Sequence, residues 1–543
     1  MTRATAIPFR DPRPVLVVGA GPVGLTSAAE LRRRGVDTHI IDHAPAPSPL
    51  TKALQVWPRT LEVLRRNADP EDVTRRSRPI DTFHYYSDGR QIARTGFTAR
   101  TQPVILTQPD VEELLDDGLG RLGGKVERGT SLVRFEQYED HVAAVLRDPE
   151  GNERSEEYAY VLGCDGASST VRGTLGRTFE GTTYPHTFML VDAYVDGPLK
   201  HDAYHFFMAP DGIVVITGLP GGRSRVFASA PLGVKPEDVR GDRAAVDLMQ
   251  RLVDERGSGG LKLRDADWTS VFAVHSRHVD RYRTGRVFLL GDAAHIHSPA
   301  GGQALNTGVT DAHNLAWKLA MVWHGEARDT LLDTYEEERT QVARAVVRQA
   351  DLQTSGWMLR DAKHKAARNL TGRLASRLNL FNHDFIPWLA GLRNVYGDGR
   401  EIRRSSWRFW RSRYVTGALA PDTSVWDVRS ASRLPLRTAL SDLRHTLLVQ
   451  VPGTAVPTQV ADTVTRIVRD HPEQVDVRVL DAGGSLHEGL DTLPSGPRPD
   501  REAQGTRLAL VRPDQYVWAH GGLDAASRLK DVLDRTLYPG REA

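Results

Sequence analysis

Residues 286–319 read RVFLLGDAAHIHSPAGGQALNTGVTDAHNLAWKL and decide the fold of this 543-residue chain. The apolar run 287–290 predicts a buried strand, which is followed by Gly-Asp at 291–292, a Pro-Ala-Gly-Gly loop at 299–302 and a long helical pattern. An acid at the end of a strand and free backbone N–H groups at the start of a helix suit a polar, partly anionic ligand. This stretch therefore predicts a cofactor site.

The N-terminal segment supplies the other half of that site. Residues 14–18 predict a short buried strand, GAGPVG follows at 19–24, and a second apolar strand at 36–41 ends in Asp42. An acid at that spacing suits a ribose hydroxyl. The three glycines of the run serve a tight turn, close approach to a pyrophosphate, and helix–strand packing, and they are Gly19, Gly21 and Gly24. Together these features predict a Rossmann-like dinucleotide-binding domain of the α/β class.

A third segment, VLGCDGASSTVR at 161–172, distinguishes this chain from a simple NAD enzyme. With it, the chain resembles the class A flavoprotein aromatic hydroxylases, single-component FAD monooxygenases built like p-hydroxybenzoate and phenol hydroxylase. They share an N-terminal GxGxxG, a central CDGxxSxVR and a late GDAAHxxxPxGGxGxN, and all three motifs stand here in that order. The resemblance spans about residues 13–350 and is of the polyketide-tailoring type.

Composition narrows the class of protein. A chain of this length should hold two or three domains, and its net charge of +2 indicates no general attraction to nucleic acid or membrane. The single cysteine, Cys164, excludes an intramolecular disulfide and a cysteine-clustered metal site, which favours the reducing cytoplasm. His295 and His297 lack a third ligand, so no metal is expected. We expect a cytoplasmic enzyme that is a monomer or a homodimer.

Three units are expected from the strand and helix patterns. Residues 1–186 and 274–400 together form the FAD-binding domain, and 187–273, with about 80–107, form an inserted antiparallel substrate-binding sheet. Residues 413–543 resemble the thioredoxin-like C-terminal domain of phenol-hydroxylase-type members, through VRPDQYVW at 511–518. Without a cysteine this unit cannot do dithiol chemistry, so a packing or dimer-edge role is expected.

The resemblance implies a set of FAD contacts spread over the motifs and the segments between them. Those residues are Gly19, Gly21, Pro22, Val23, Gly24, Asp42, Lys52, Arg59, Gln108, Asp165, Gly166, Asp292, Pro299, Gly301, Gly302, Ala304, Leu305 and Asn306. Asp42 would hold the adenosine ribose, Asp165 and Arg59 the ribose and pyrophosphate region, and Asp292 the ribityl hydroxyls. Backbone N–H groups near 305–306 would face the flavin edge that becomes anionic on reduction.

Three positions depart from the family pattern. Ala304 replaces the usual glycine of GGxGxN, and because alanine tolerates positive φ poorly we expect altered loop geometry or flavin mobility there. Asp42-His43 stands where Glu-Arg is commoner, and Lys52 stands where many relatives carry arginine near the mobile flavin. FAD binding as a whole is still expected.

The implied reaction uses FAD, NADPH or NADH, and O2. In this family the reduced flavin forms a C4a-hydroperoxide, whose distal oxygen passes to an electron-rich phenolic ring. Only one dinucleotide fingerprint is present, so the nicotinamide is expected to bind transiently. The expected substrate-binding sheet, here called the roof, is rich in aromatic residues and has no obvious arginine pair to bind a carboxylate. This favours a bulky phenolic or polycyclic aromatic substrate; the aromatic residues are Tyr184, Phe188, Phe206 and Phe207.

The candidate catalytic groups are Pro299, beside the flavin, and three titratable side chains, Tyr204, His205 and His84. The sequence also leaves open that no dedicated base exists. Two alternative functions remain at this point. One is Baeyer–Villiger oxygen insertion on the same framework, and the other is a non-enzymatic flavoprotein that sequesters an aromatic antibiotic.

Overall fold

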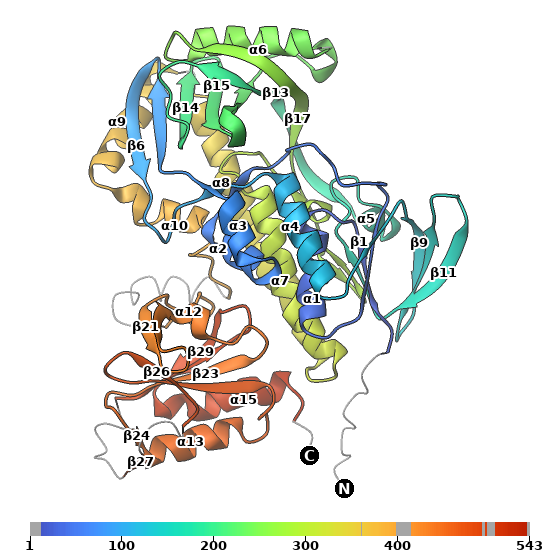
Figure 1. The fold of residues 1–543 in the computed structure, drawn as a ribbon, viewed down its shortest axis with the longest axis vertical. Helices are drawn as coiled ribbons and strands as arrows, with labels where there is room; N and C mark the ends of the chain where they lie inside the picture. The colour runs from blue at the N-terminus through green and yellow to red at the C-terminus, as the bar shows by residue number, and fades with distance from the viewer. Residues whose placement is uncertain are drawn as a thin grey trace.

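The computed structural model describes residues 12–239, 241–359, 361–397, 414–490, 495–496 and 505–539. Its architecture rests on three large sheets and the helices that cover them (Figure 1). Among the described helices, none combines the length and the apolar character needed to span a bilayer. The described residues also contain no group of three His, Cys, Asp or Glu side chains arranged to hold a metal ion.

The first sheet is mostly parallel. Its strands are β1 (Val15–Val18), β2 (Thr38–Asp42), β8 (Val126–Arg128), β12 (Tyr160–Gly163), β18 (Arg283–Thr284) and β19 (Val287–Leu289). They follow the order β18-β19-β12-β1-β2-β8, and only the edge pair β18–β19 is antiparallel. The continuous apolar runs of β1, β12 and β19 are fully buried because helices cover the sheet. This confirms the predicted Rossmann-like α/β class.

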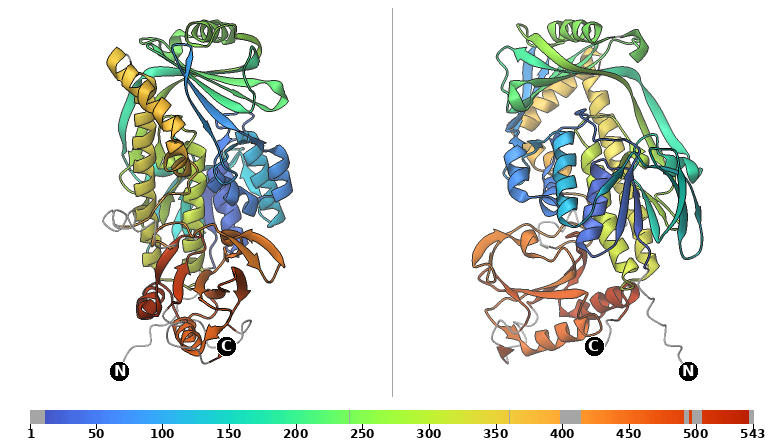
Figure 2. Two further views of the ribbon diagram at one scale, coloured as in Figure 1. Left: turned by 90° about the vertical axis from the view of Figure 1, so that its left-hand side faces the viewer. Right: turned by 45° about the vertical axis from the view of Figure 1, so that its right-hand side comes forward.

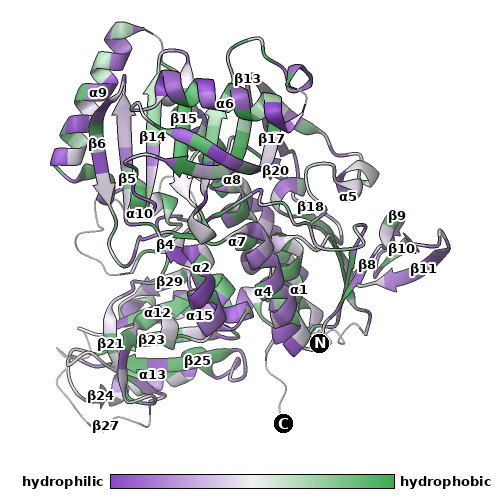
Figure 3. Ribbon diagram, turned by 45° about the horizontal axis from the view of Figure 1, so that its top comes forward, coloured by the Kyte–Doolittle hydropathy of each residue, from purple (hydrophilic) through white to green (hydrophobic). Residues whose placement is uncertain are grey.

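The helices of this unit come from widely separated parts of the chain. They are α1 (Pro22–Arg33), α2 (Pro58–Asn67), α3 (Pro70–Arg76), α4 (Gln108–Arg121), α5 (Thr170–Thr174), α7 (Ala304–Trp323) and α8 (Asp333–Trp357). Helix α7 is buried along nearly its whole length, packs on α1 and runs beside α8 (Figure 2). A small antiparallel sheet projects from this unit, and its outer strand is hydrophilic (Figure 3); its strands are β9 (Ser131–Gln137), β10 (Val142–Arg147) and β11 (Glu153–Tyr158).

The second large sheet forms a roof over one end of the molecule. Its strands are β5 (Thr82–Ser87), β6 (Arg90–Gly96), β13 (Phe179–Asp196), β14 (Ala203–Ala209), β15 (Gly212–Gly218), β16 (Ser224–Ser229), β17 (Lys262–Val279) and β20 (His295–Ile296). The order is β20-β17-β13-β16-β15-β14-β5-β6. Helix α6 (Asp242–Arg256) covers the outer face and α9 (Ala362–Arg377) lies against β6 (Figure 1).

The roof differs in extent from the ranges expected from the sequence. Strands β13 and β17 each have 18 residues. Strand β13 begins at Phe179, before residue 187, and β17 ends at Val279, after residue 273. The segment near 80–107 contributes β5 and β6, but its last strand, β7 (Val104–Ile105), pairs instead with β3 (Gln55–Val56) and β4 (Arg78–Pro79). Turn signals located the hairpins but could not reveal that their longest strands curve down into the first unit.

The third sheet belongs to the C-terminal unit. Its strands are β21 (Ser424–Asp427), β22 (Ser432–Pro435), β23 (His445–Gln450), β25 (Val475–Leu480), β26 (Ser485–Glu488), β28 (Arg507–Val511) and β29 (Val517–Gly521). Strands β23 and β25 are parallel and are joined through α13 (Thr458–Val468), whereas β28 and β29 form a hairpin before α15 (Ala526–Thr536). This arrangement fits the expected thioredoxin-like unit. The start expected at residue 413 lies outside the described residues.

Candidate active site

The glycine turn after β1 leaves room for a ligand. Gly19 has a φ of +101°, and a Cβ on it would lie 2.5 Å from the carbonyl oxygen of Cys164. A Cβ on Gly24 would lie 1.8 Å from the Gly19 carbonyl oxygen, whereas a Cβ on Gly21 would meet nothing within 4 Å. Packing of the turn therefore requires Gly19 and Gly24, while Gly21 borders open space, as a backbone that approaches a pyrophosphate should.

Asp42 adjoins the same turn from the end of β2. Its carboxylate accepts hydrogen bonds from the backbone N–H groups of Ala20, at 2.6 Å, and Ala44, at 2.8 Å. Helix α1 begins at Pro22 directly after the turn, with Val23 in its first turn, and no side chain caps it. The acid and the helix N-terminus are thus placed to meet a ribose hydroxyl and a pyrophosphate.

The stretch after β19 places a carboxylate at the edge of a cavity. Asp292 belongs to the short 3-10 helix η3 (Gly291–Ala293), lines that cavity and is exposed. Desolvation raises the pKa of Asp292, while the nearby His295 and Lys52 oppose the rise. None of the hydrogen bonds among the described residues reaches its carboxylate. It is therefore free to accept hydrogen bonds from a hydroxyl-rich ligand.

Two glycines shape the loop between Pro299, which lines the cavity, and α7. Gly301 and Gly302 have φ of +81° and +61°, and a Cβ on Gly302 would lie 2.8 Å from Oε1 of Gln55. Ala304, in contrast, is the first residue of α7 and has no positive φ. The expectation that this alanine alters the loop geometry is therefore wrong, because the position does not require a glycine conformation.

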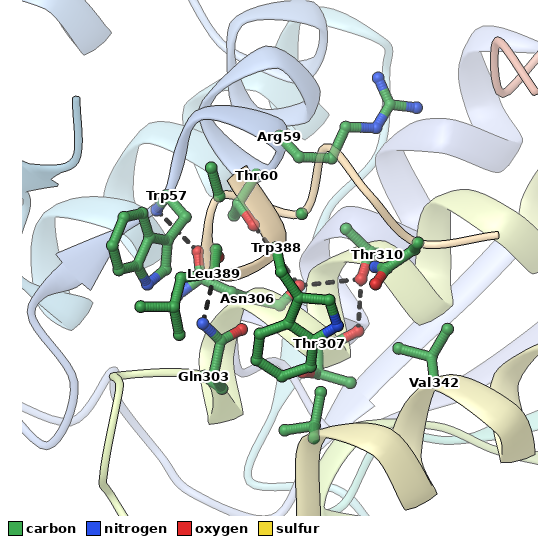
Figure 4. A pocket seen from close by; sticks show the side chains of 14 residues that line it. Trp57, Arg59, Thr60, Gln303, Asn306, Thr307, Thr310, Val342, Trp388 and Leu389 are labelled. Carbon is green, nitrogen blue, oxygen red and sulfur yellow. Dashed lines mark hydrogen bonds between the residues drawn. The ribbon is translucent and has the colours of Figure 1, made fainter. Parts of the chain in front are cut away.

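Asn306 holds this loop from behind. Its Nδ2 donates to the carbonyl oxygens of Gly302, at 2.6 Å, and Gln55, at 2.9 Å, and its Oδ1 accepts from the backbone N–H of Trp57 at 2.8 Å. Figure 4 shows Asn306 and Trp57 among the residues around a small pocket of about 20 Å³ on that side. Ala304 and Leu305 line the large cavity, whereas Asn306 does not. The side chain of Asn306 is thus a support, and the start of α7 is what meets the ligand.

A cavity of about 830 Å³ lies between this loop, the inner face of the roof and the helices α8, α9 and α10 (Phe385–Leu389). Small-molecule sites occupy roughly 300–1,000 Å³, so this one is large. Its walls are mainly apolar and aromatic, with contributions from Phe83, Tyr85, Tyr204, Phe206, Trp357 and Phe381. Of the four roof aromatics singled out in the sequence, Phe206 lines the cavity, and the other three do not.

The three predicted titratable candidates separate onto two faces of the roof. Tyr204 lines the cavity, and burial raises the pKa of its hydroxyl, which keeps it protonated. His205 points to the opposite face because side chains alternate along β14, and its Nε2 contacts the carbonyl oxygen of Lys200 at 3.0 Å. His84 stacks on His205 on that outer face. The prediction that His84 and His205 act on a substrate in the cavity is therefore wrong.

Arg59 also has a position that the sequence did not predict. Its guanidinium donates to Glu62, at 2.7 Å, and to Gln515 and the carbonyl oxygen of Asp514 in the C-terminal unit, at 2.8 and 2.7 Å. The side chain is buried and does not line the large cavity. It is therefore not available to hold a ribose or pyrophosphate.

The remaining predicted FAD contacts are Lys52, Asp165, Gly166 and Gln108, and they differ in what they contact. Lys52 lines the cavity opposite Asp292. Asp165 accepts from the Ser169 hydroxyl at 2.5 Å and caps the following turn, and Gly166 beside it has open space around its Cβ position. Gln108 accepts from the backbone N–H of Ala53 at 3.3 Å and thereby fixes the segment next to Lys52, and its Nε2 donates to the Glu112 carboxylate at 2.9 Å.

Two residues of the site were missed at the sequence level. Asp311 accepts hydrogen bonds from Gly291 N–H, His295 Nε2 and Arg339 Nε, and so ties α7 to the motif after β19. A charged residue inside an otherwise buried apolar helix was the signal that could have revealed it. His297 lines the cavity, and burial lowers the pKa of its imidazole to about 4, so it is neutral near pH 7.

Comparisons with known proteins agree with this geometry. Residues 13–350, more than half of the chain, match the family described as "FAD binding domain". The chain belongs to this family. It is a flavin-dependent aromatic monooxygenase with FAD as its cofactor, and a nicotinamide co-substrate is typical of such enzymes.

Relatives of the enzyme match over nearly the whole chain. It is 33% identical over 539 residues to 6-methylpretetramide 4-monooxygenase of Streptomyces rimosus, covering 95% of this chain and 92% of that one. It is 31% identical over 547 residues to pentachlorophenol 4-monooxygenase of Sphingobium chlorophenolicum, covering 96% of each. Among solved structures, OxyS anhydrotetracycline hydroxylase from Streptomyces rimosus superposes with a TM-score of 0.72 at 27% identity, covering 98% of this chain and 100% of that one.

The residues present suit FAD. Gly21 leaves space for a pyrophosphate, Asp292 offers a carboxylate without a protein donor, and the uncapped start of α7 presents backbone N–H groups to the cavity. A helix N-terminus stabilises negative charge by about 0.3–2 kcal/mol, so it suits the edge of a flavin that gains negative charge on reduction.

Proposed function

We propose that the enzyme hydroxylates a polycyclic phenolic substrate that lies in the large cavity beneath the roof. The aromatic walls under the roof carry this proposal, because they extend well beyond the edge at Asp292 and Ala304 where the flavin would lie, in a cavity of about 830 Å³ that would hold both the flavin ring and the substrate. Two similar proteins, 6-methylpretetramide 4-monooxygenase and anhydrotetracycline hydroxylase, support the same substrate class.

Within this proposal the three units have separate tasks. Residues 1–186 and 274–400 bind FAD, 187–273 with about 80–107 cover the substrate, and 413–543 support the first unit. Bound FAD would supply the activation of O2. NADPH is the first nicotinamide to test, with NADH second, and a cytoplasmic location is supported by one buried, unpaired cysteine, Cys164.

The chain's own residues orient the ligands and exclude water. Asp292 would accept hydrogen bonds from ribityl hydroxyls, and the start of α7 would face the flavin edge that becomes anionic. Tyr204, kept protonated by burial, would donate a hydrogen bond to an oxygen of the substrate. The apolar walls would hold the ring and keep bulk water from the reacting oxygen. No base acts on the substrate from the outer face of the roof.

Substrate-stimulated oxidation of NADPH tests the proposal. The FAD-loaded enzyme is assayed with phenol, a naphthol and a tetracyclic phenol, and each product is characterised by NMR. We expect stimulation and a new aromatic hydroxyl group with the tetracyclic compound. Stimulation by phenol alone would contradict the proposed substrate class. A lactone or ester product would assign Baeyer–Villiger insertion instead, and tight binding without turnover of any compound would favour a sequestering role.

A further inference from the structure

The C-terminal unit reaches the cofactor loop through a single buried arginine. Arg59, which is 3% exposed, donates to three acceptors: the Glu62 carboxylate on its own helix, the Gln515 side-chain oxygen and the Asp514 carbonyl oxygen. Two of these acceptors come from the turn between β28 and β29. A buried guanidinium needs such partners, so this contact is specific in both position and orientation.

Neighbours of Arg59 form hydrogen bonds with both ends of the loop 301–303. Two residues before it, Trp57 donates from Nε1 to the Gly301 carbonyl oxygen at 3.0 Å. The backbone N–H of Arg59 itself donates to the carbonyl oxygen of Ala390 at 3.2 Å. Beside Ala390, Leu389 accepts from Gln303 Nε2 at 3.1 Å. Figure 4 shows Trp57, Gln303 and Leu389 converging on this part of α7.

The turn that holds Arg59 is itself tightly fixed. Gln515 has a φ of +67°, an unfavourable conformation for a residue other than glycine, and its Nε2 donates to the Arg437 carbonyl oxygen at 2.6 Å. Arg512 anchors the other end of the turn through two bonds to Glu338 on α8, at 2.5 and 2.9 Å. The surroundings must therefore stabilise this turn, which makes it a rigid support.

We propose that Arg59 and the turn 512–516 form a brace that positions the loop 299–303 against FAD. Through this brace the C-terminal unit adjusts cofactor binding without touching the cofactor. Arg59 and Gln515 are thus positioning residues. The inference rests on the assignment of the loop 299–303 to the FAD site, and it gives the cysteine-free C-terminal unit a task beyond packing.

The chain offers a matched control for this brace. Arg33, at the far end of α1 from the glycine turn, donates to Asp442 of the C-terminal unit at 2.6 Å. This ion pair joins the same two units but does not contact the loop 299–303. Arg33→Met therefore weakens the interface alone, whereas Gln515→Met removes both side-chain hydrogen bonds of the brace at nearly constant side-chain length.

The experiment measures the FAD dissociation constant by flavin fluorescence, the visible absorption spectrum of the bound flavin, and thermal unfolding of the FAD-free protein. We expect both variants to unfold at lower temperature. Only Gln515→Met should raise the FAD dissociation constant, by about threefold to tenfold, the size of effect typical of residues that act through a packed network, and shift the flavin spectrum. Gln515→Glu, which keeps an acceptor for Arg59, should return both readouts toward wild type.

Equal FAD dissociation constants for Gln515→Met and wild type, within twofold, would overturn the brace. So would an equal increase in Arg33→Met, because the effect would then follow general loosening of the interface. If Gln515→Met does not fold, Gln515→Asn, whose amide is too short to reach Arg59, replaces it. Failure of the wild-type protein to bind FAD would instead overturn the assignment of the site itself.

Discussion

Asp292 lies before α7 and is exposed at the wall of the large cavity, whereas Asp311 lies within α7 and is fully buried, so the surroundings of these two carboxylates differ completely. Asp311 has three donors, from Gly291, His295 and Arg339, at 2.6–3.1 Å. Burial favours a higher pKa for Asp311, but Arg339 and His295 outweigh it and lower the pKa. None of the described residues donates a hydrogen bond to Asp292, and desolvation raises its pKa.

The difference separates stability from binding. A carboxylate with its full set of donors contributes to the native structure, because removing one partner leaves the other charge buried and unpaired. A carboxylate that faces a cavity without protein donors adds little to the stability of the fold, and it gains hydrogen bonds when a ligand with hydroxyl groups binds. We therefore expect the same substitution at these two positions to have opposite consequences.

Asp311→Asn should give the largest effect on folding. Because it leaves the buried guanidinium of Arg339 without its ion partner, we expect a loss of about 3–5 kcal/mol in the free energy of unfolding without FAD. Asp292→Asn in the same assay should change it by less than about 0.5 kcal/mol or stabilise the protein. Denaturant unfolding measures both variants, and equal destabilisation would remove the distinction between the two sites.

Asp292→Asn should have its effect on the cofactor instead. Loss of hydrogen bonds to a charged acceptor should weaken FAD binding by about tenfold to a hundredfold. Flavin fluorescence titration of the purified variant measures this directly. A variant that keeps wild-type FAD affinity would show that Asp292 does not contact the cofactor.

The stability of the protein at low pH should depend on His445, a fully buried histidine of the C-terminal unit. Burial, reinforced by the positive charge of Arg512, lowers the pKa of His445 to about 3, and its ring lies between Trp317 and Trp518. In the unfolded chain its pKa is about 6.5, so the unfolded state binds more protons in this window and stability falls as pH decreases below about 6.5.

Between pH 6.5 and pH 5 this histidine should remove about 2 kcal/mol from the free energy of unfolding. His445→Phe, which keeps an aromatic ring edge-on to Trp317 and stacked on Trp518, should reduce that dependence on pH. Unfolding curves at several pH values compare the variant with wild type. An unchanged slope would mean that another group controls acid stability.

The smallest effects on activity are expected from substitutions on the two faces of the roof. Tyr204→Phe should lower kcat/KM by about twofold to tenfold, the cost of one neutral hydrogen bond. His205→Gln should leave kcat/KM within about twofold of wild type, because its side chain lies on the outer face. Steady-state assays with the best substrate of the screen measure both. A larger loss in His205→Gln would return that residue to the list of catalytic candidates.

Local sequence patterns predicted most of the fold and part of the candidate site. Strand β1, the glycine turn and Asp42 could be read directly because their roles depend on backbone geometry and on neighbours close in sequence. The late motif placed Asp292 and Pro299 at the cavity for the same reason. The error at Ala304 arose because a motif records which residue is common and not which φ the position requires.

The sequence by itself determined the cofactor, the family and the order of the structural units, since short motifs encode the turns that bind a dinucleotide. Only the tertiary structure decided which face of the roof lines the cavity and what Arg59 contacts. One register of β14 sends Tyr204 inward and His205 outward, and two of the three acceptors of Arg59 lie more than 450 positions away in the chain. Such contacts depend on packing between distant segments, which no local pattern records.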